Sequence, residues 1–217
     1  MYTMREGASA TMALTLLMFV YLRIVHRPQA ADIAADLKTA HDDVEAKSSA
    51  AVSARRQRML TTAEIRTLDE ELDAAVSRYV KALMALLPEG RVDARTLRMF
   101  PVTPTEMTTG QGSEEQSRML KNVLAVHDSE AELAAISPFA EVLRAALAAI
   151  DAARAQRALD YDAEQAANAA LRASLVRTRG VYNGAYPRLQ VAFPGKKGLI
   201  RSFYYRPEKG DEGDVTG

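Results

Sequence analysis

Apolar side chains recur every three or four residues along two long runs of the sequence. The first run holds Leu68, Leu72, Ala75, Tyr79, Leu83 and Leu86. The second run holds Phe139, Leu143, Ala146, Ile150 and Ala153. Because an α-helix turns once in about 3.6 residues, this spacing places the apolar residues of each run on one helix face. Each run therefore predicts an amphipathic helix that buries one face against a neighbour.

The remainder of the chain favours helices over strands. Alanine, the residue with the highest helix propensity, supplies 18 of the 46 residues from 131 to 176. No stretch alternates apolar and polar residues between hairpin-type turns, and the best strand candidate, 199–205, fits a short helix equally well. The sequence therefore predicts an all-α protein: an elongated antiparallel bundle of about four to six helices, with the alanine-rich character of a coiled coil.

Local signals indicate where these helices begin and end. Start signals are the capping-type sequences at Thr61, Ser113, Ser129 and Ser137, and either Asp160 or Asp162. Stop signals are the Pro- and Gly-containing segments 87–90, 101–112, 180–187 and 194–195. We expect helices to begin and end at these points.

The segment 7–22 contains no charged residue, and two arginines and a histidine follow it within five positions. Three interpretations are open: a central core helix, a membrane-associated segment through residues 7–25, or a helix that faces a partner. The run is shorter than the ~20 apolar residues of a transmembrane helix, and basic residues follow it where a signal peptide has small ones. We expect a core helix, with Leu17 in contact with stripe residues such as Leu72 or Leu143.

Charge is segregated along the chain, although its 28 basic and 28 acidic residues balance. Residues 166–206 contain eight basic residues, six of the thirteen aromatic residues and no Asp or Glu. Because phosphate-binding surfaces combine cations with aromatic side chains, this segment is the candidate anion- or partner-binding site. The candidate residues are Arg172, Arg179, Arg188, Lys196, Lys197, Arg201, Arg206 and Tyr204. In the structural alternative the aromatic residues plug the end of the bundle, and the cations pair with carboxylates such as Asp69 and Asp73.

The sequence offers little for catalysis. It has no cysteine, which excludes disulfides, thiolate metal sites and cysteine nucleophiles, and it has no phosphate-binding loop or nucleophile-elbow motif. The nearest approaches to a metal-ligand cluster are His41 with Asp42, Asp43 and Glu45, and His127 with Asp128 and Glu130. Both clusters are more typical of a solvated helix surface. We expect no catalytic residue, metal or cofactor; an enzyme whose site the sequence does not reveal is the remaining alternative.

The two halves of the chain resemble each other. Pro28 and Pro138 each begin a helix-rich stretch that ends at a proline and a glycine and is followed by basic residues and a phenylalanine. These stretches define a candidate internal repeat, 28–101 and 138–207, whose alternative explanation is coincidence. A duplication predicts two related helical hairpins.

We expect residues 1–207 to form a single helical bundle and residues 208–217, with four acids, to form a disordered tail. Without a catalytic motif, the chain is interpreted as a non-enzymatic, cytoplasmic interaction or scaffold protein that binds a protein partner or a second copy of itself. The alternative is a polyanion-binding module that uses 165–207 to bind an anionic membrane surface, an acidic protein or nucleic acid. Cations gathered on one exposed face would favour the module, whereas cations paired with carboxylates would favour the scaffold.

Overall fold

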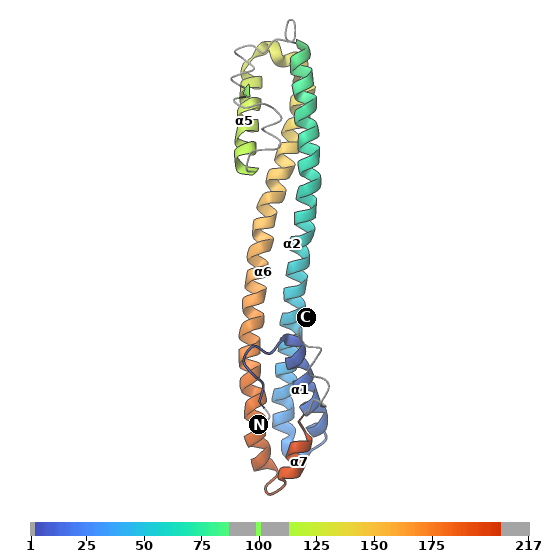
Figure 1. Cartoon of the computed structure of the whole chain (residues 1–217), viewed down its shortest axis with the longest axis vertical. Helices are drawn as coiled ribbons and strands as arrows, with labels where there is room; N and C mark the ends of the chain where they lie inside the picture. Colours follow the sequence, from blue (N-terminus) through green and yellow to red (C-terminus); the bar gives the residue numbers. More distant parts are fainter. Residues whose placement is uncertain (1–2, 87–98, 101–112, 205–217) are drawn as a thin grey trace. The chain divides into compact units, whose positions relative to one another are not determined.

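The structure is a computed structural model that describes residues 3–86, 99–100 and 113–204. Regular structure within these residues is helical throughout, and they contain no strand (Figure 1). In chain order the elements are α1 (Ala10–Ile24), the 3-10 helix η1 (Pro28–Ala30), α2 (Ala31–Leu86), α5 (Ser113–Ser129), the 3-10 helix η3 (Ala131–Ile136), α6 (Ser137–Ala192) and α7 (Lys197–Ser202). The prediction of an all-α bundle is confirmed. The predicted loop 101–112 and the predicted tail 208–217 lie outside the described residues.

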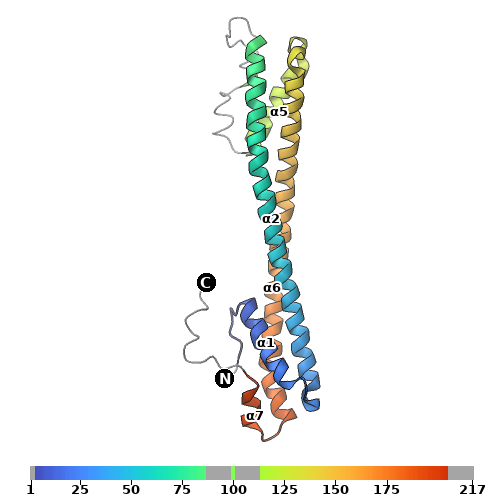
Figure 2. The same ribbon diagram turned by 90° about the vertical axis from the view of Figure 1, so that its right-hand side faces the viewer.

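The chain divides into two compact units. Unit 1 comprises Met1–Arg56 and Asp162–Gly217, and unit 2 comprises Gln57–Tyr161. The two longest helices, α2 and α6, have 56 residues each and contribute one part to each unit. Within a unit these parts pack side by side in opposite directions (Figures 1 and 2).

Both long helices continue through residues at which the sequence predicts a boundary. The starts predicted at Thr61 and at Asp160 or Asp162 are wrong, because these residues lie inside α2 and α6. The Thr61 hydroxyl donates to the Asp160 carboxylate of the opposite helix over 2.5 Å, so these side chains join two helices instead of capping them. The interruption predicted around Pro187 is also wrong. Pro187 lies less than two turns from the end of α6, and there its missing N–H removes a single helical hydrogen bond.

Unit 1 forms its core around α1, the first part of α2, the last part of α6, and α7 (Figure 1). Its buried side chains include Leu17, Val20, Ile24, Leu37, Leu189, Ile200 and Phe203. Ser9 caps α1 by accepting a hydrogen bond from the Met12 amide. The apolar run at the N-terminus is thus a core helix in this structure. The contacts predicted for Leu17 are wrong, because Leu72 and Leu143 belong to the core of unit 2; the run defines an apolar face but not which helices cover it.

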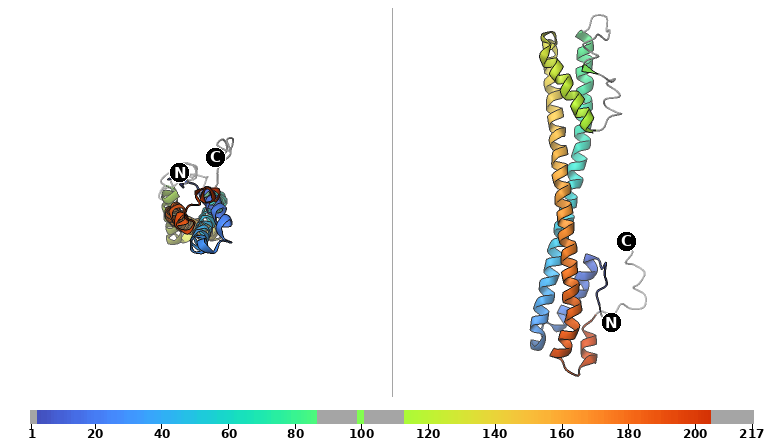
Figure 3. Two further views of the ribbon diagram at one scale, coloured as in Figure 1. Left: turned by 90° about the horizontal axis from the view of Figure 1, so that it is seen from below. Right: turned by 90° about the vertical axis from the view of Figure 1, so that its left-hand side faces the viewer.

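Unit 2 forms its core from α5, η3, the last part of α2 and the first part of α6 (Figures 2 and 3). α5 and α6 begin at the predicted residues, Ser113 and Ser137. The buried side chains include Leu72, Tyr79, Leu83, Leu120, Leu143 and Ile150, together with Met99 and Phe100. Most members of the two predicted stripes therefore face this core.

The two units bury equivalent positions of the two long stretches. Ala30, Ile33, Leu37, Ala40, Leu72, Ala75, Tyr79 and Leu83 are buried, and so are the residues 110 positions later, Ala140, Leu143, Leu147, Ile150, Tyr182, Ala185, Leu189 and Phe193. A short helix and a 3-10 helix precede both α2 and α6. The internal repeat stays a prediction, and these correspondences are what a duplicated helical hairpin would give.

One stretch of helix among the described residues, Ala131–Ala192, has a segment long and apolar enough to cross a membrane by length and composition. α1 has 15 residues and falls short of that length. Mostly buried core helices of soluble proteins satisfy the same criterion, whereas 33% of this segment is buried.

Candidate functional site

Two of the predicted anion-binding arginines are held by carboxylates. Arg188 donates to Asp36 over 2.6 Å and to Asp32 over 2.8 Å, both on the first turns of α2. These hydrogen bonds, that of Asp36 first, raise the pKa of the Arg188 guanidinium. Arg179 lies 3.6 Å from the carboxylate of Glu6. Arg179 and Arg188 therefore join segments of unit 1, and their charges are already balanced.

The predicted aromatic residue Tyr204 is part of the core. Its ring packs edge-on against Tyr182 and Tyr186, with centroids 5.6 and 5.7 Å apart. Burial raises the pKa of Tyr182 to about 12 and raises that of Tyr204 further. Phe193 and Phe203 are buried beside each other, with ring centroids 5.9 Å apart. These rings plug the end of unit 1, as the structural alternative predicts, and offer no exposed face for stacking.

The other predicted cations of α7 are exposed, and the structure adds a second basic segment beside them. Lys196, Lys197 and Arg201 face solvent. The Arg27 guanidinium lies 5.0 Å from the Phe203 ring centroid and 6.0 Å from that of Phe193, which brings the chain after α1 against α7. We call Arg23, His26, Arg27, Lys196, Lys197 and Arg201 the basic end of unit 1.

Sequence reasoning identified only half of this basic end. The signal for the other half is present in the sequence, because residues 7–31, like 166–206, contain no Asp or Glu. Of the remaining predicted residues, Arg172 is exposed on α6, and Arg206 lies outside the described residues.

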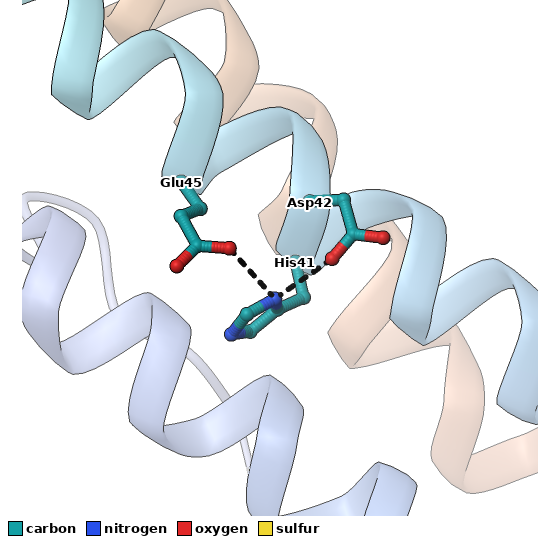
Figure 4. Close-up of side chains that lie close together, drawn as sticks. All are labelled: His41, Asp42 and Glu45. Atoms are coloured by element: carbon teal, nitrogen blue, oxygen red, sulfur yellow. Dashed lines mark hydrogen bonds and ion pairs between the residues drawn. The ribbon is translucent and has the colours of Figure 1, made fainter.

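The predicted histidine cluster on α2 is present, and a lysine occupies part of it. His41 Nδ1 lies 3.1 Å from Asp42 Oδ1 and 4.0 Å from Glu45 Oε2 (Figure 4). The three groups could each offer one ligand atom to a cation, but Lys38 Nζ lies 2.6 Å from both carboxylate oxygens of Asp42. Lys38, first, and His41 lower the pKa of Asp42. Lys38 therefore supplies the positive charge that a metal would bring, and the absence of a metal stays a prediction.

The second histidine is buried in unit 2, where sequence reasoning expected a surface cluster. His127 Nδ1 lies 3.1 Å from the Tyr79 hydroxyl oxygen, and His127 Nε2 lies 3.4 Å from Ser137 Oγ. Asp128 instead binds Arg144 on the outside, over 2.9 and 3.0 Å. The expectation of a solvated His127 is wrong, because the imidazole fills a core position and satisfies both nitrogens there. Nothing in the spacing of these residues along the sequence indicates this chain of contacts.

On α2, the Asp69 carboxylate pairs with a cation other than those predicted for it. Asp69 accepts a hydrogen bond from Arg154 of α6 over 3.2 Å. Asp73 Oδ1 is buried and has no hydrogen-bond partner among the described residues. Desolvation, first, and the neighbouring charge of Asp69 raise the pKa of Asp73. The Asp73 carboxylate is therefore partly removed from solvent.

No protein-family model matches this chain, and the searches of curated proteins and of solved structures found no similar protein.

Proposed function

We propose that this protein is a non-enzymatic helical interaction protein that self-associates through an exposed apolar face of unit 2. The observation that carries the proposal is the exposure of Leu60 on α2 and Leu159 on α6, which are 56% and 62% accessible. Each leucine precedes a residue of the Thr61–Asp160 hydrogen bond that joins the two helices.

Helix geometry puts the two leucines on one side of the helix pair. Each residue of an α-helix is rotated by about 100° from the one before it. Thr61 and Asp160 point towards each other, and the helices run in opposite directions. The residue before Thr61 and the residue before Asp160 therefore turn to the same side of the pair, and Tyr161 turns to the opposite side.

Alanines extend this apolar face along α6. Ala152 and Ala155 are exposed and follow the same three-to-four spacing as Leu159. α5 contacts α6 through Asp151 and Arg154, beside these alanines, and leaves both alanines exposed. Small side chains let a further helix approach closely.

A second copy of the chain fits this face, because a symmetric dimer would cover Leu60 and Leu159 of both copies in one contact. Full burial of a leucine side chain is worth about 1.5–3 kcal/mol, so covering the exposed parts of four leucines gives roughly 4–7 kcal/mol. Association entropy opposes this gain. We therefore expect a reversible dimer.

The polar clusters support an interaction role over catalysis. Arg179, Arg188, Asp42 and Asp69 each take part in an ion pair that joins two segments or two turns of helix. Such pairs are typical of groups that hold helices in place. A cytoplasmic location, with which the absence of cysteine is compatible, is part of the proposal.

Sedimentation equilibrium of the full chain tests the proposal. Wild type should show a mass that rises from monomer to dimer with concentration, and the double variant Leu60→Glu/Leu159→Glu should stay monomeric. The matched control Met59→Glu/Tyr161→Glu adds the same charge at equally exposed apolar residues on other sides of the pair, and it should dimerise like wild type. A wild type that stays monomeric, or a control that loses the dimer as fully as the test variant, would refute the proposed face.

A further inference from the structure

The basic end of unit 1 is a surface of one charge sign built from two distant parts of the sequence. Arg23, His26 and Arg27 come from the end of α1 and the turn after it, and Lys196, Lys197 and Arg201 come from α7 and the residue before it. The contact of Arg27 with the Phe203 ring holds the two parts together. Figure 3 shows α7 and the end of α1 beside each other in the view from below.

No carboxylate of the described residues neutralises this surface. Among the described residues, the acids nearest along the chain, Asp32 and Asp36, are bound by Arg188. None of the five Lys and Arg residues of the basic end forms an ion pair with a described carboxylate, whereas Arg177 and Arg179 on α6 do. The positive charge of the basic end is therefore available to an anionic partner.

An exposed apolar side chain lies next to these cations. Leu22, one residue before Arg23 and four before His26, is 60% exposed. The described aromatic rings near these cations are buried or partly buried, among them Phe193 and Phe203. Free cations beside an exposed leucine, with no fully exposed ring near them among the described residues, suit the interface of a lipid bilayer better than single-stranded nucleic acid.

We propose that the basic end of unit 1 binds the surface of a bilayer that contains anionic phospholipids. The Lys and Arg side chains bind the headgroup phosphates, and Leu22 enters the apolar boundary beneath them. Each cation near an anionic bilayer strengthens binding roughly fivefold. This surface is separate from the face of unit 2 proposed for self-association, so either proposal can fail without the other.

Vesicle co-sedimentation of the full chain tests the inference. Wild type should bind vesicles of equal parts phosphatidylserine and phosphatidylcholine, should not bind vesicles of phosphatidylcholine alone, and should be released by added salt. Lys196→Glu/Lys197→Glu/Arg201→Glu should weaken binding by at least about 100-fold, because three cations are lost and three repulsive charges are added. These side chains are exposed and unpaired among the described residues, so circular dichroism should show unchanged helicity.

The matched control is Arg55→Glu/Arg56→Glu/Arg172→Glu. It makes the same change in net charge at exposed arginines of unit 1, and Arg55 lies about 36 Å along α2 from the first residue of that helix. This control should bind the anionic vesicles like wild type. If it loses as much binding as the test variant, binding reflects overall charge and the site is wrong.

A second variant separates a bilayer from other polyanions. Leu22→Ser leaves every charge in place, and it should weaken vesicle binding up to about tenfold through lost apolar burial. It should leave any binding to a DNA duplex unchanged. A wild type that binds a DNA duplex but not the anionic vesicles would overturn the inference, and so would equal vesicle binding by wild type and the triple glutamate variant.

Discussion

Replacing Leu17 by alanine tests whether the N-terminal apolar run belongs to the core of a water-soluble unit. Leu17 is fully buried, with 0% exposure, in the core that α1 forms with α2, α6 and α7. Truncation removes the buried branched end of the side chain and leaves a cavity. In well-packed cores this change costs about 3–5 kcal/mol. Because the melting temperature of a chain of this size falls by about 2–4 °C per kcal/mol, we expect a decrease of roughly 6–20 °C.

Leu22→Ala is the matched control, because it makes the same chemical change five residues further along α1. Leu22 is largely exposed, so its truncation should change the free energy of unfolding by less than about 0.5 kcal/mol. Urea unfolding without detergent, followed by circular dichroism at 222 nm in both variants and wild type, gives both values.

Equal effects of the two substitutions would refute this placement of α1. The same conclusion would follow if wild type required detergent to stay in solution and a chain that lacks residues 1–27 did not, because the apolar run would then lie in lipid. If α1 is a core helix, removing it should instead unfold unit 1, since it supplies a large part of that core.

Three further substitutions probe buried polar groups, each by urea unfolding. Tyr79→Phe should cost about 1–3 kcal/mol, because it leaves the buried His127 Nδ1 without its partner. Asp73→Asn should stabilise the protein by up to about 1 kcal/mol at pH 7 and have no effect near pH 3. The pKa of Asp73 is raised above 3.8 in the folded protein. The contribution of Asp73 to stability is therefore favourable below pH 3.8 and is lost as pH rises through the folded pKa. Ser174→Ala should cost about 1 kcal/mol at pH 7 and less in acid, because it removes the hydrogen bond that the Ser174 hydroxyl donates to the Asp43 carboxylate. This hydrogen bond is the largest cause that lowers the pKa of Asp43. It therefore stabilises the protein above pH 3.8, and its contribution is lost as pH falls through the folded pKa.

Exposed residues of the same type provide the controls for these three variants: Tyr161→Phe, Asp162→Asn and Ser53→Ala. Each control should lie within about 0.5 kcal/mol of wild type. A Tyr79→Phe variant as stable as its control would mean that the hydroxyl does not satisfy the imidazole. A stabilising effect of Asp73→Asn that is larger at about pH 3 than at about pH 7, or a cost of Ser174→Ala that is larger in acid, would contradict the environments described for Asp73 and Asp43.

The fold class could be predicted from local periodicity, because the spacing of the apolar residues shows which face of each helix is apolar. Leu72, Tyr79, Leu143 and Ile150 are buried as that pattern predicts. The lengths of the helices could not be predicted in the same way. A side chain that could cap a helix can instead bind a residue of another helix, which the local sequence does not show. Thr61 has the sequence of a cap, yet its hydroxyl is used by a carboxylate 99 residues away.

The candidate site stays a prediction. Lys196, Lys197 and Arg201, which lie in the segment 166–206 without Asp or Glu, are exposed. A count of charges along a segment does not reveal partners from other segments, so the pairing of Arg188 with α2 was missed. The contribution of α1 to the basic end was missed because Arg27 meets Phe203 only in the folded chain.

Site-specific cross-linking between copies tests the proposed self-association most directly. The chain has no cysteine, so a thiol-specific cross-link can form only at the single cysteine that is introduced. Ala155→Cys places it on the exposed apolar face of unit 2, and Tyr161→Cys places it on the opposite side of the helix pair. With a bis-maleimide reagent, we expect a covalent dimer for Ala155→Cys and little for Tyr161→Cys. No dimer at Ala155→Cys, or equal dimer at both positions, would contradict it.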